Sequence, residues 1–289
     1  MKTTVIHHSA DFDGLFCREI ARKFLPSSTE LIGWDYGQPL IPMPDSGLVY
    51  VLDLNPECII NPDLQRIIWI DHHKSAIEKW GLALIMGYRI DGVAACRLAW
   101  QWFSREALPG HLPVKEDFVA RRVNEPLAVR LAGEYDIWDK RDPRAEAFQF
   151  GLRSDDWGDE DWAMLLRGPG APAMNSFVDT LLERGELLQR YQRGVDKSTV
   201  SRAFEVKFEG LTFLALNTAR CNSLTFESAA QPNHDGLMGF YFNGQEWRVS
   251  LYHSPHHREH DLSAIAGKYG GGGHRGACGF RADKLPFIP

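Results

Sequence analysis

Aspartate and histidine side chains that could bind metal ions follow three short apolar runs in the first part of the sequence. They are His7, Asp11 and Asp13 after the first run, Asp53 after the second, and Asp71, His72 and His73 after the third. Carboxylates held close together repel one another and take up protons, and divalent cations remove that repulsion. Ligation by carboxylate and imidazole without thiolate fits Mn²⁺, Mg²⁺, Fe²⁺ or Co²⁺, and Zn²⁺ stays open. The set predicts two ions that share a carboxylate and activate a water for attack on phosphorus.

Each of these residues also has an ordinary explanation when it is taken alone. A single aspartate after a strand is more often a helix N-cap than a ligand, and Asp11 and Asp13 could cap a helix that starts near Gly14. The joint pattern favours the metal interpretation: a histidine before Asp-x-Asp-Gly, an aspartate that ends one run, and Asp-His-His after another.

The elements that must position these residues are short strands that alternate with helices. The apolar runs Thr4–His7, Leu48–Leu52 and Ile67–Ile70 are typical of strands, and helical spacing covers Gly14–Phe24, Gly92–Phe103 and Asp117–Ala132. This alternation predicts an α/β fold with a parallel sheet and flanking helices. In such a sheet ligands bind outside the carboxyl ends of the strands, so three strands would bring the side chains to one edge.

The second part of the sequence has a different pattern. A long helix is expected over Asn175–Ser201, after an exposed loop with a short helix at Arg153–Ala173, and strands are expected at Phe204–Phe208, Leu211–Leu216, Gly239–Phe242 and Trp247–Tyr252. We therefore expect a catalytic domain over residues 1–190, a linker at 191–203 that ends the connecting helix, and a smaller α/β domain over 204–289.

The composition limits the cellular locations and binding partners to be expected. The 289 residues carry a net charge of −6, which disfavours duplex DNA as a partner. The start of the chain lacks the apolar core of a signal peptide, and no uncharged apolar run approaches the ~20 residues that span a bilayer. The five scattered cysteines form no Cys-x-x-Cys pair. We therefore expect a cytoplasmic protein that binds no membrane; a homodimer stays open.

A glycine-rich element near the C-terminal end is a candidate phosphate site. Gly270–Gly273 precede His274 and Arg275, and backbone N–H groups of Gly272 and Gly273 can approach phosphate oxygens closely. Arg275 can add a bidentate contact. Four glycines also suit a plain linker, but this run stands between an expected helix at Leu262–Tyr269 and an apolar segment.

Two further groups of polar residues in this part are open to two interpretations. Arg220 and Asn222 could contact a nucleotide or serve ordinary turn chemistry. His253, His256, His257 and His260 form a histidine-rich patch that could bind metal, although a solvated loop is favoured because only Asp261 is spaced as a carboxylate partner.

Taken together, these motifs resemble those of the DHH phosphoesterase superfamily with a C-terminal DHHA1 domain, of the oligoribonuclease or RecJ-like type. The motifs are His7–Gly14, Val51–Asp53, Asp71–His73, Gly133–Trp138 and Gly270–Phe280. They extend over nearly the full length of the chain.

The resemblance implies a role for each matching residue. His7 and Asp11 would bind one metal, Asp13, His72 and Asp136 the other, and Asp53 both. His73 would face the scissile phosphate, and Asp71 would orient the histidines. His8 is the alternative ligand to His7, and Glu134 and Asp139 are the alternatives to Asp136.

The function implied is a phosphoesterase or phosphodiesterase that uses two divalent ions, with Mn²⁺ expected first and Mg²⁺, Fe²⁺ or Co²⁺ open, and hydrolyses short oligonucleotides, dinucleotides or related nucleotide phosphates. One alternative is a catalytically silent nucleotide sensor, which would be expected to lack part of the acidic set. Another is a pyrophosphate or polyphosphate hydrolase, although such relatives lack the Gly-Gly-Gly-His element.

Overall fold

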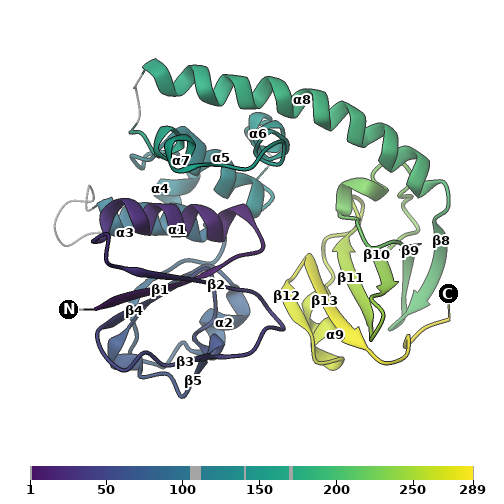
Figure 1. Ribbon diagram of the computed structural model, residues 1–289. Coiled ribbons are helices and arrows are strands. Elements are labelled where there is room, and N and C mark those ends of the chain that lie inside the picture. The colour runs from purple at the N-terminus through teal and green to yellow at the C-terminus, as the bar shows by residue number, and fades with distance from the viewer. Residues whose placement is uncertain (1, 105–111, 140, 169–171, 289) are drawn as a thin grey trace. The chain divides into compact units, whose positions relative to one another are not determined.

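The computed structural model describes residues 2–104, 112–139, 141–168 and 172–288. The chain divides into two compact units, Met1–Leu188 and Gln189–Pro289, which Figure 1 shows in purple to green and in green to yellow. The division falls inside the long helix α8 (Pro172–Val200). No described helix is long and apolar enough to cross a membrane.

A parallel sheet is the frame of the first unit. Among the described residues five strands form it in the order β2 (Glu30–Trp34), β1 (Thr3–His8), β4 (Leu48–Leu52), β6 (Ile67–Asp71) and β7 (Met86–Arg89). His7 pairs with Leu52 of β4, and Leu52 pairs with Ile70 of β6. The three central strands therefore end level with one another, so the residues that follow them start from the same edge. The α/β fold with a parallel sheet is confirmed.

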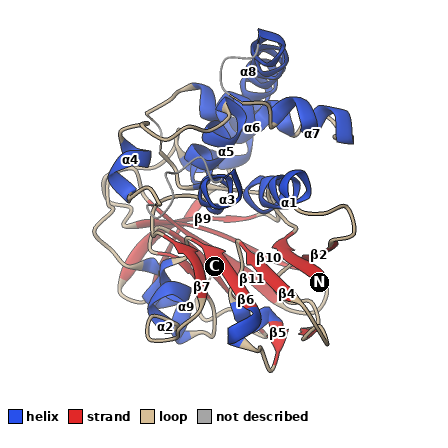
Figure 2. Ribbon diagram, turned by 90° about the vertical axis from the view of Figure 1, so that its left-hand side faces the viewer, coloured by secondary structure: helices blue, strands red, loops and turns tan. Residues whose placement is uncertain are grey.

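Alternate strand residues supply two apolar layers. Val5, Leu52 and Ile70 are buried under α1 (Phe12–Phe24) and α3 (Ala95–Ser104), while Val51 and Trp69 are buried on the opposite face. Because side chains of a strand point alternately to the two faces, strands buried on both sides are apolar throughout. Figure 2 shows α1 and α3 on one side of these strands and α2 (Lys74–Lys79) on the other. The short pair β3 (Ile41–Pro42) and β5 (Ile59–Ile60) lies with the second layer.

One helix expected after the sheet is divided in the structure. The single helix expected over Asp117–Ala132 is two helices, α4 (Lys115–Val119) and α5 (Leu127–Asp136). Pro126 is the physical reason, since proline has no N–H to donate and ends or starts helices. The chain continues through α6 (Arg144–Leu152) and α7 (Asp159–Leu165) into α8.

The second unit is a mixed sheet with a helix. Its described strands are arranged β12 (Gly272–His274), β13 (Ala277–Ala282), β11 (Trp247–His253), β10 (Gly236–Phe242), β9 (Leu211–Asn217) and β8 (Phe204–Phe208). Only β9 and β10 pair in parallel within this described sheet. The helix α9 (Leu262–Lys268) packs its apolar face against Phe208 and Phe280.

Candidate metal centre

Most of the expected ligands meet at the carboxyl edge of the parallel sheet. Three groups within the described part of the first unit each place three ligand atoms within 4.8 Å of one another. Two of them hold most of the expected ligands: His8, Asp11 and Asp53, and Asp13, His72 and Asp136. The third is Asp53, Asp71 and His73. Strands β1, β4 and β6 each deliver at least one of these residues, and α1 and α5 deliver the others.

The first group contains His8 where His7 was expected. His8 Nδ1 lies 3.0 Å from Asp11 Oδ2 and 3.4 Å from Asp53 Oδ2. His7 is buried within the strand, and its Nδ1 lies 2.7 Å from the carbonyl oxygen of His8. Successive strand residues point to opposite faces, so only one of the two histidines can join this group. This geometry favours His8 over His7, and the choice between the two histidines stays a prediction.

Asp11 combines the two roles that its sequence context allowed. Its Oδ1 accepts a hydrogen bond from the backbone N–H of Gly14 at 3.0 Å and so caps α1. Its Oδ2 faces His8. Because a carboxylate has two oxygens with two lone pairs each, capping and metal binding do not compete here.

Asp13 and His72 are the buried members of the second group. Asp13 accepts hydrogen bonds of 2.8 Å from the backbone N–H groups of Ala95 and Cys96, at the start of α3. His72 Nε2 lies 3.6 Å from Asp13 Oδ2 and 3.3 Å from Asp136 Oδ2. The N-terminus of α3 thus fixes the Asp13 carboxylate and stabilises its negative charge. Sequence reasoning gave no indication of this support, because it depends on a contact between segments far apart along the chain.

Asp53 stands between the two groups. Its Oδ2 faces His8 at 3.4 Å, and its Oδ1 lies 3.4 Å from His72 Nε2. Its backbone has φ of 56°, in the left-handed region that non-glycine residues rarely adopt. The backbone N–H of Asp53 donates to the carbonyl of Ile70 at 2.9 Å, which holds this conformation at the end of β4. Such strain is typical of functional positions, and the placement is the one that a bridging ligand requires.

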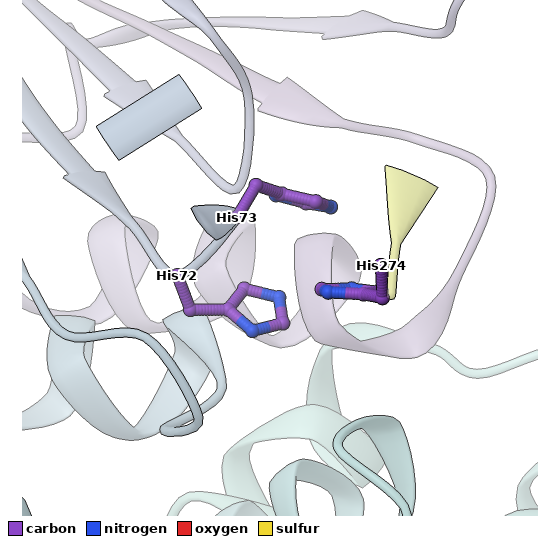
Figure 3. Close-up of side chains that lie close together, drawn as sticks. All are labelled: His72, His73 and His274. Carbon is purple, nitrogen blue, oxygen red and sulfur yellow. The ribbon is translucent and has the colours of Figure 1, made fainter. Parts of the chain in front are cut away.

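Asp71 organises the two histidines that follow it. Its Oδ1 accepts from the backbone N–H of His72 at 2.7 Å and lies 2.7 Å from His73 Nδ1. Asp71 is fully buried, and the two imidazole rings lie 4.7 Å apart at a tilt of 50°. Figure 3 shows the two rings side by side, each reaching away from the loop after β6. The geometry agrees with a positioning role for Asp71.

The two acidic residues that competed with Asp136 bind arginines instead. Glu134 is fully buried and accepts hydrogen bonds from Arg121 and Arg130. Asp139 pairs with Arg141. Of the three, only Asp136 joins a described group of ligands.

The carboxylates and imidazoles buried at this edge of the sheet have shifted pKa values. Burial, followed by repulsion from Asp53 and Asp136, raises the pKa of Asp13 well above its usual range. Burial likewise raises the pKa of Asp136 to about 6. Burial would raise the pKa of Asp53 too, but the imidazoles of His72 and His8 beside it outweigh burial and lower it. Burial would lower the pKa of His8, but Asp11 and Asp53 raise it to about 11.

These features fit divalent cations. Asp53 Oδ1 and Asp136 Oδ2 are buried and make no hydrogen bond of normal geometry to the described residues. Buried carboxylate oxygens are normally satisfied, and exceptions call for a ligand or an ion. Oxygen and imidazole donors without a thiolate suit Mn²⁺, Mg²⁺, Fe²⁺ or Co²⁺.

The glycine-rich element of the second unit is a hairpin rather than an open loop. Gly272 and Gly273 belong to β12, where Gly273 pairs with Cys278 and His274 with Ala277 of β13. Gly273 has φ of +130°, and a Cβ at Gly271 would meet the carbonyl oxygen of Gly279 at 2.1 Å. Gly271 and Gly273 are therefore needed for close strand pairing, which disfavours a plain linker.

The remaining residues expected to bind substrate lie at the surface of this unit. Arg275 is exposed and donates a hydrogen bond to the carbonyl of Glu259. Arg220 is exposed, whereas the side chain of Asn222 caps the short helix Ser223–Phe226 by accepting from Leu224 and Thr225. The turn interpretation therefore accounts for Asn222, and substrate binding by Arg220, His274 and Arg275 stays a prediction.

Comparison with known proteins identifies the fold. The sequence matches no protein-family model and no curated protein. The structure is similar to the DHH domain of a member of the S1p family of ribosomal proteins, with a TM-score of 0.52, 14% identity, and coverage of 99% of this chain and 83% of that chain. It is similar also to RecJ of Thermus thermophilus in complex with Mn²⁺ (TM-score 0.50, 14% identity), where it covers 98% of this chain and 50% of RecJ.

A pGpG-specific phosphodiesterase from Vibrio cholerae has a TM-score of 0.47 at 15% identity, with 98% of this chain and 94% of that chain covered. The first two likenesses show a shared fold. They confirm the fold that the sequence motifs implied.

Proposed function

We propose that this chain, which has the fold of DHH-domain proteins, is a phosphoesterase that depends on divalent metal ions. The observation that carries the proposal is the meeting of two aspartate–histidine groups across the single carboxylate of Asp53, at the carboxyl edge of the parallel sheet. Ligands of open α/β sheets bind at this edge. RecJ, one of the similar structures, was solved with Mn²⁺, which supports this ion.

The residues divide into two sets of ligands. His8 and Asp11 would hold one ion, Asp13, His72 and Asp136 the other, and Asp53 both. When bound, two such ions offset the charge of a phosphate and lower the pKa of water. The chain itself holds the ligands in place: α3 fixes Asp13, and α1 is capped by Asp11.

His73 is the side chain that we assign to the substrate. Burial would lower its pKa, but the hydrogen bond to Asp71 raises it. The raised pKa favours the imidazolium, which is a donor at both ring nitrogens and can donate to a phosphate oxygen. A charged donor aimed at a developing oxyanion stabilises the transition state, so Asp71 acts through His73.

Short nucleotide substrates fit the rest of the molecule. A net charge of −6 disfavours a long polyanion that must be gripped along its backbone. The hairpin of β12 and β13 carries His274 and Arg275, which supply one or two phosphate contacts rather than a long groove. We therefore propose short oligonucleotides, dinucleotides or related nucleotide phosphates as substrates.

The alternatives are disfavoured by particular residues. A silent nucleotide sensor would have no need of the strained, buried Asp53 between two ligand groups. A pyrophosphate or polyphosphate hydrolase would not account for the close-packed Gly271–Gly273 hairpin.

A substrate panel tests the proposal. Protein freed of metal by chelation is given Mn²⁺ and offered pApA, cyclic dinucleotides, 3′-phosphoadenosine 5′-phosphate, pyrophosphate, and RNA and DNA of two to ten nucleotides. We expect Mn²⁺-dependent hydrolysis of a short nucleotide substrate, with none in chelator. Turnover of pyrophosphate alone would support the polyphosphate alternative, and tight binding without turnover of any substrate would support the sensor.

A further inference from the structure

A cluster of side chains in the second unit is equipped to bind a cation of its own. Asp235, His257 and His260 offer three ligand atoms within 4.8 Å of one another. Asp235 lies directly before β10, and the two histidines lie in the loop between β11 and α9. All three are partly exposed, so an ion can reach them from solvent. The proposed phosphoesterase centre uses none of them.

The donor atoms have the spacing of a metal shell. His257 Nδ1 lies 2.9 Å from Glu259 Oε1, and His260 Nε2 lies 3.7 Å from the same oxygen. His260 Nε2 lies 3.8 Å from Asp235 Oδ1. Ligands about 2.0–2.1 Å from a tetrahedral Zn²⁺ ion are about 3.3 Å from one another, so these distances are near those of a shell. Glu259 is exposed and outside the group of three, and it would turn toward the ion to complete the shell.

The two nitrogens of the His257 ring face different partners. Its Nε2 lies 2.7 Å from the carbonyl oxygen of Pro232, which can only accept, so Nε2 carries a hydrogen. Its Nδ1 faces Glu259 Oε1 at 2.9 Å, and an ion bound there would replace the proton between these two atoms. Histidines that bind metals almost always donate their other N–H to a carbonyl or carboxylate in this way.

Asp235 is oriented by the sheet. Its Oδ2 accepts from the backbone N–H of Thr212 at 2.7 Å, and its own N–H donates to the carbonyl of Thr212 at 2.8 Å. Its Oδ1 is the oxygen that faces His260. Because one oxygen of this carboxylate is held by a hydrogen bond and the other faces His260, the side chain loses little conformational freedom when it binds an ion.

The loop that carries the histidines is held as well. The carbonyl of His260 lies 2.8 Å from His253 Nε2 of β11, and the carbonyl of Glu259 accepts from Arg275. Because Arg275 follows β12, an ion at this cluster would tie together the segment before β10, the loop before α9 and the glycine-rich hairpin.

We propose that Asp235, His257, Glu259 and His260 form a second metal site, which takes a divalent transition-metal ion of the Zn²⁺ type. Two imidazoles and two carboxylates form a four-ligand shell of the kind that suits tetrahedral zinc. Ion pairs at the surface contribute little to stability, so the shell would gain most of its stabilisation from the ion.

Metal stoichiometry of the full-length protein tests this site without any activity measurement. Chelated protein is loaded with Zn²⁺ alone, desalted and analysed for zinc per chain, and Co²⁺ loading is followed by its visible spectrum. We expect His257→Ala/His260→Ala to bind one Zn²⁺ fewer than the wild type and to lose tetrahedral Co²⁺ absorption. Asp235→Asn should weaken the same site and keep the fold.

His256→Ala is the matched control, because His256 adjoins His257 but is outside the cluster and lies near the carbonyl of Ala230. It should bind as much zinc as the wild type. The same comparison in an Asp53→Asn background separates this site from the ligands of the first unit. Equal zinc content and affinity in wild type, His257→Ala/His260→Ala and Asp235→Asn would overturn the proposal, as would equal losses in His256→Ala.

Discussion

Asp71→Asn isolates the part of the proposed mechanism that acts through His73. The substitution keeps the shape of the side chain and an oxygen for the backbone N–H of His72, but it removes the buried negative charge 2.7 Å from His73 Nδ1. Hydrogen bonds to charged groups contribute about 1.5–3 kcal/mol. Loss of such a bond corresponds to about a 10- to 100-fold change in the fraction of charged His73 at a pH above its pKa.

The direction of the pH dependence follows from the direction in which the pKa of His73 is shifted. Burial lowers the pKa of His73, but the hydrogen bond to Asp71 and the charges of Asp71 and Asp53 together outweigh burial and raise it. Activity that needs the imidazolium is therefore present at lower pH and is lost as the pH rises through this raised pKa. Without Asp71 the loss begins at a lower pH, so kcat at a pH above both pKa values falls about 10- to 100-fold.

The assay is a pH profile of kcat and kcat/KM with saturating Mn²⁺ on the best substrate of the panel. His73→Asn and His73→Asn/Asp71→Asn are the controls. If Asp71 acts through His73, the second substitution should change little once His73 is gone. An alkaline limb that stays in place in Asp71→Asn, or an undiminished effect of Asp71→Asn in the His73→Asn background, would refute this reasoning.

Three other predictions concern the metal ligands and their neighbours. Mn²⁺ affinity should fall as the pH drops through about 6, the pKa to which burial raises Asp136, because a protonated carboxyl is a poor ligand. Calorimetry in buffers of different ionisation enthalpy should show that protons are released on binding. An affinity that does not depend on pH would contradict this prediction. His8→Asn should weaken Mn²⁺ binding at least about tenfold, whereas His7→Asn should not; equal losses would restore His7 as a ligand. Glu134→Gln should lower the free energy of unfolding by about 3 kcal/mol in urea titrations because it weakens the buried contacts to Arg121 and Arg130, while metal content stays that of the wild type.

Strand ends were the most predictable part of the site. β-branched runs that stop at an aspartate or histidine indicated the ligand edge, and the structure brings Asp11, Asp13, Asp53, His72 and Asp136 into the two groups. Local periodicity was sufficient here, because a parallel sheet fixes where its carboxyl ends lie.

The features that depend on contacts between distant segments could not be predicted from the sequence. His7 and His8 are adjacent, and the side of the strand that faces Asp11 depends on the register of β1 against β2 and β4. The support of Asp13 by the start of α3 joins segments that no motif connects. The strand pairing of Gly272 and Gly273 could not be read from four glycines, since the same run suits a mobile linker.

The most direct test of the metal centre is Asp53→Asn, measured for bound Mn²⁺ and for turnover on the same preparation. Asp53 is the carboxylate between both groups of ligands, and asparagine keeps its size while removing its charge. The two-metal account predicts a folded protein that has lost Mn²⁺ from the first unit and at least about 10²-fold of kcat. Wild-type turnover and Mn²⁺ content in this variant would contradict it.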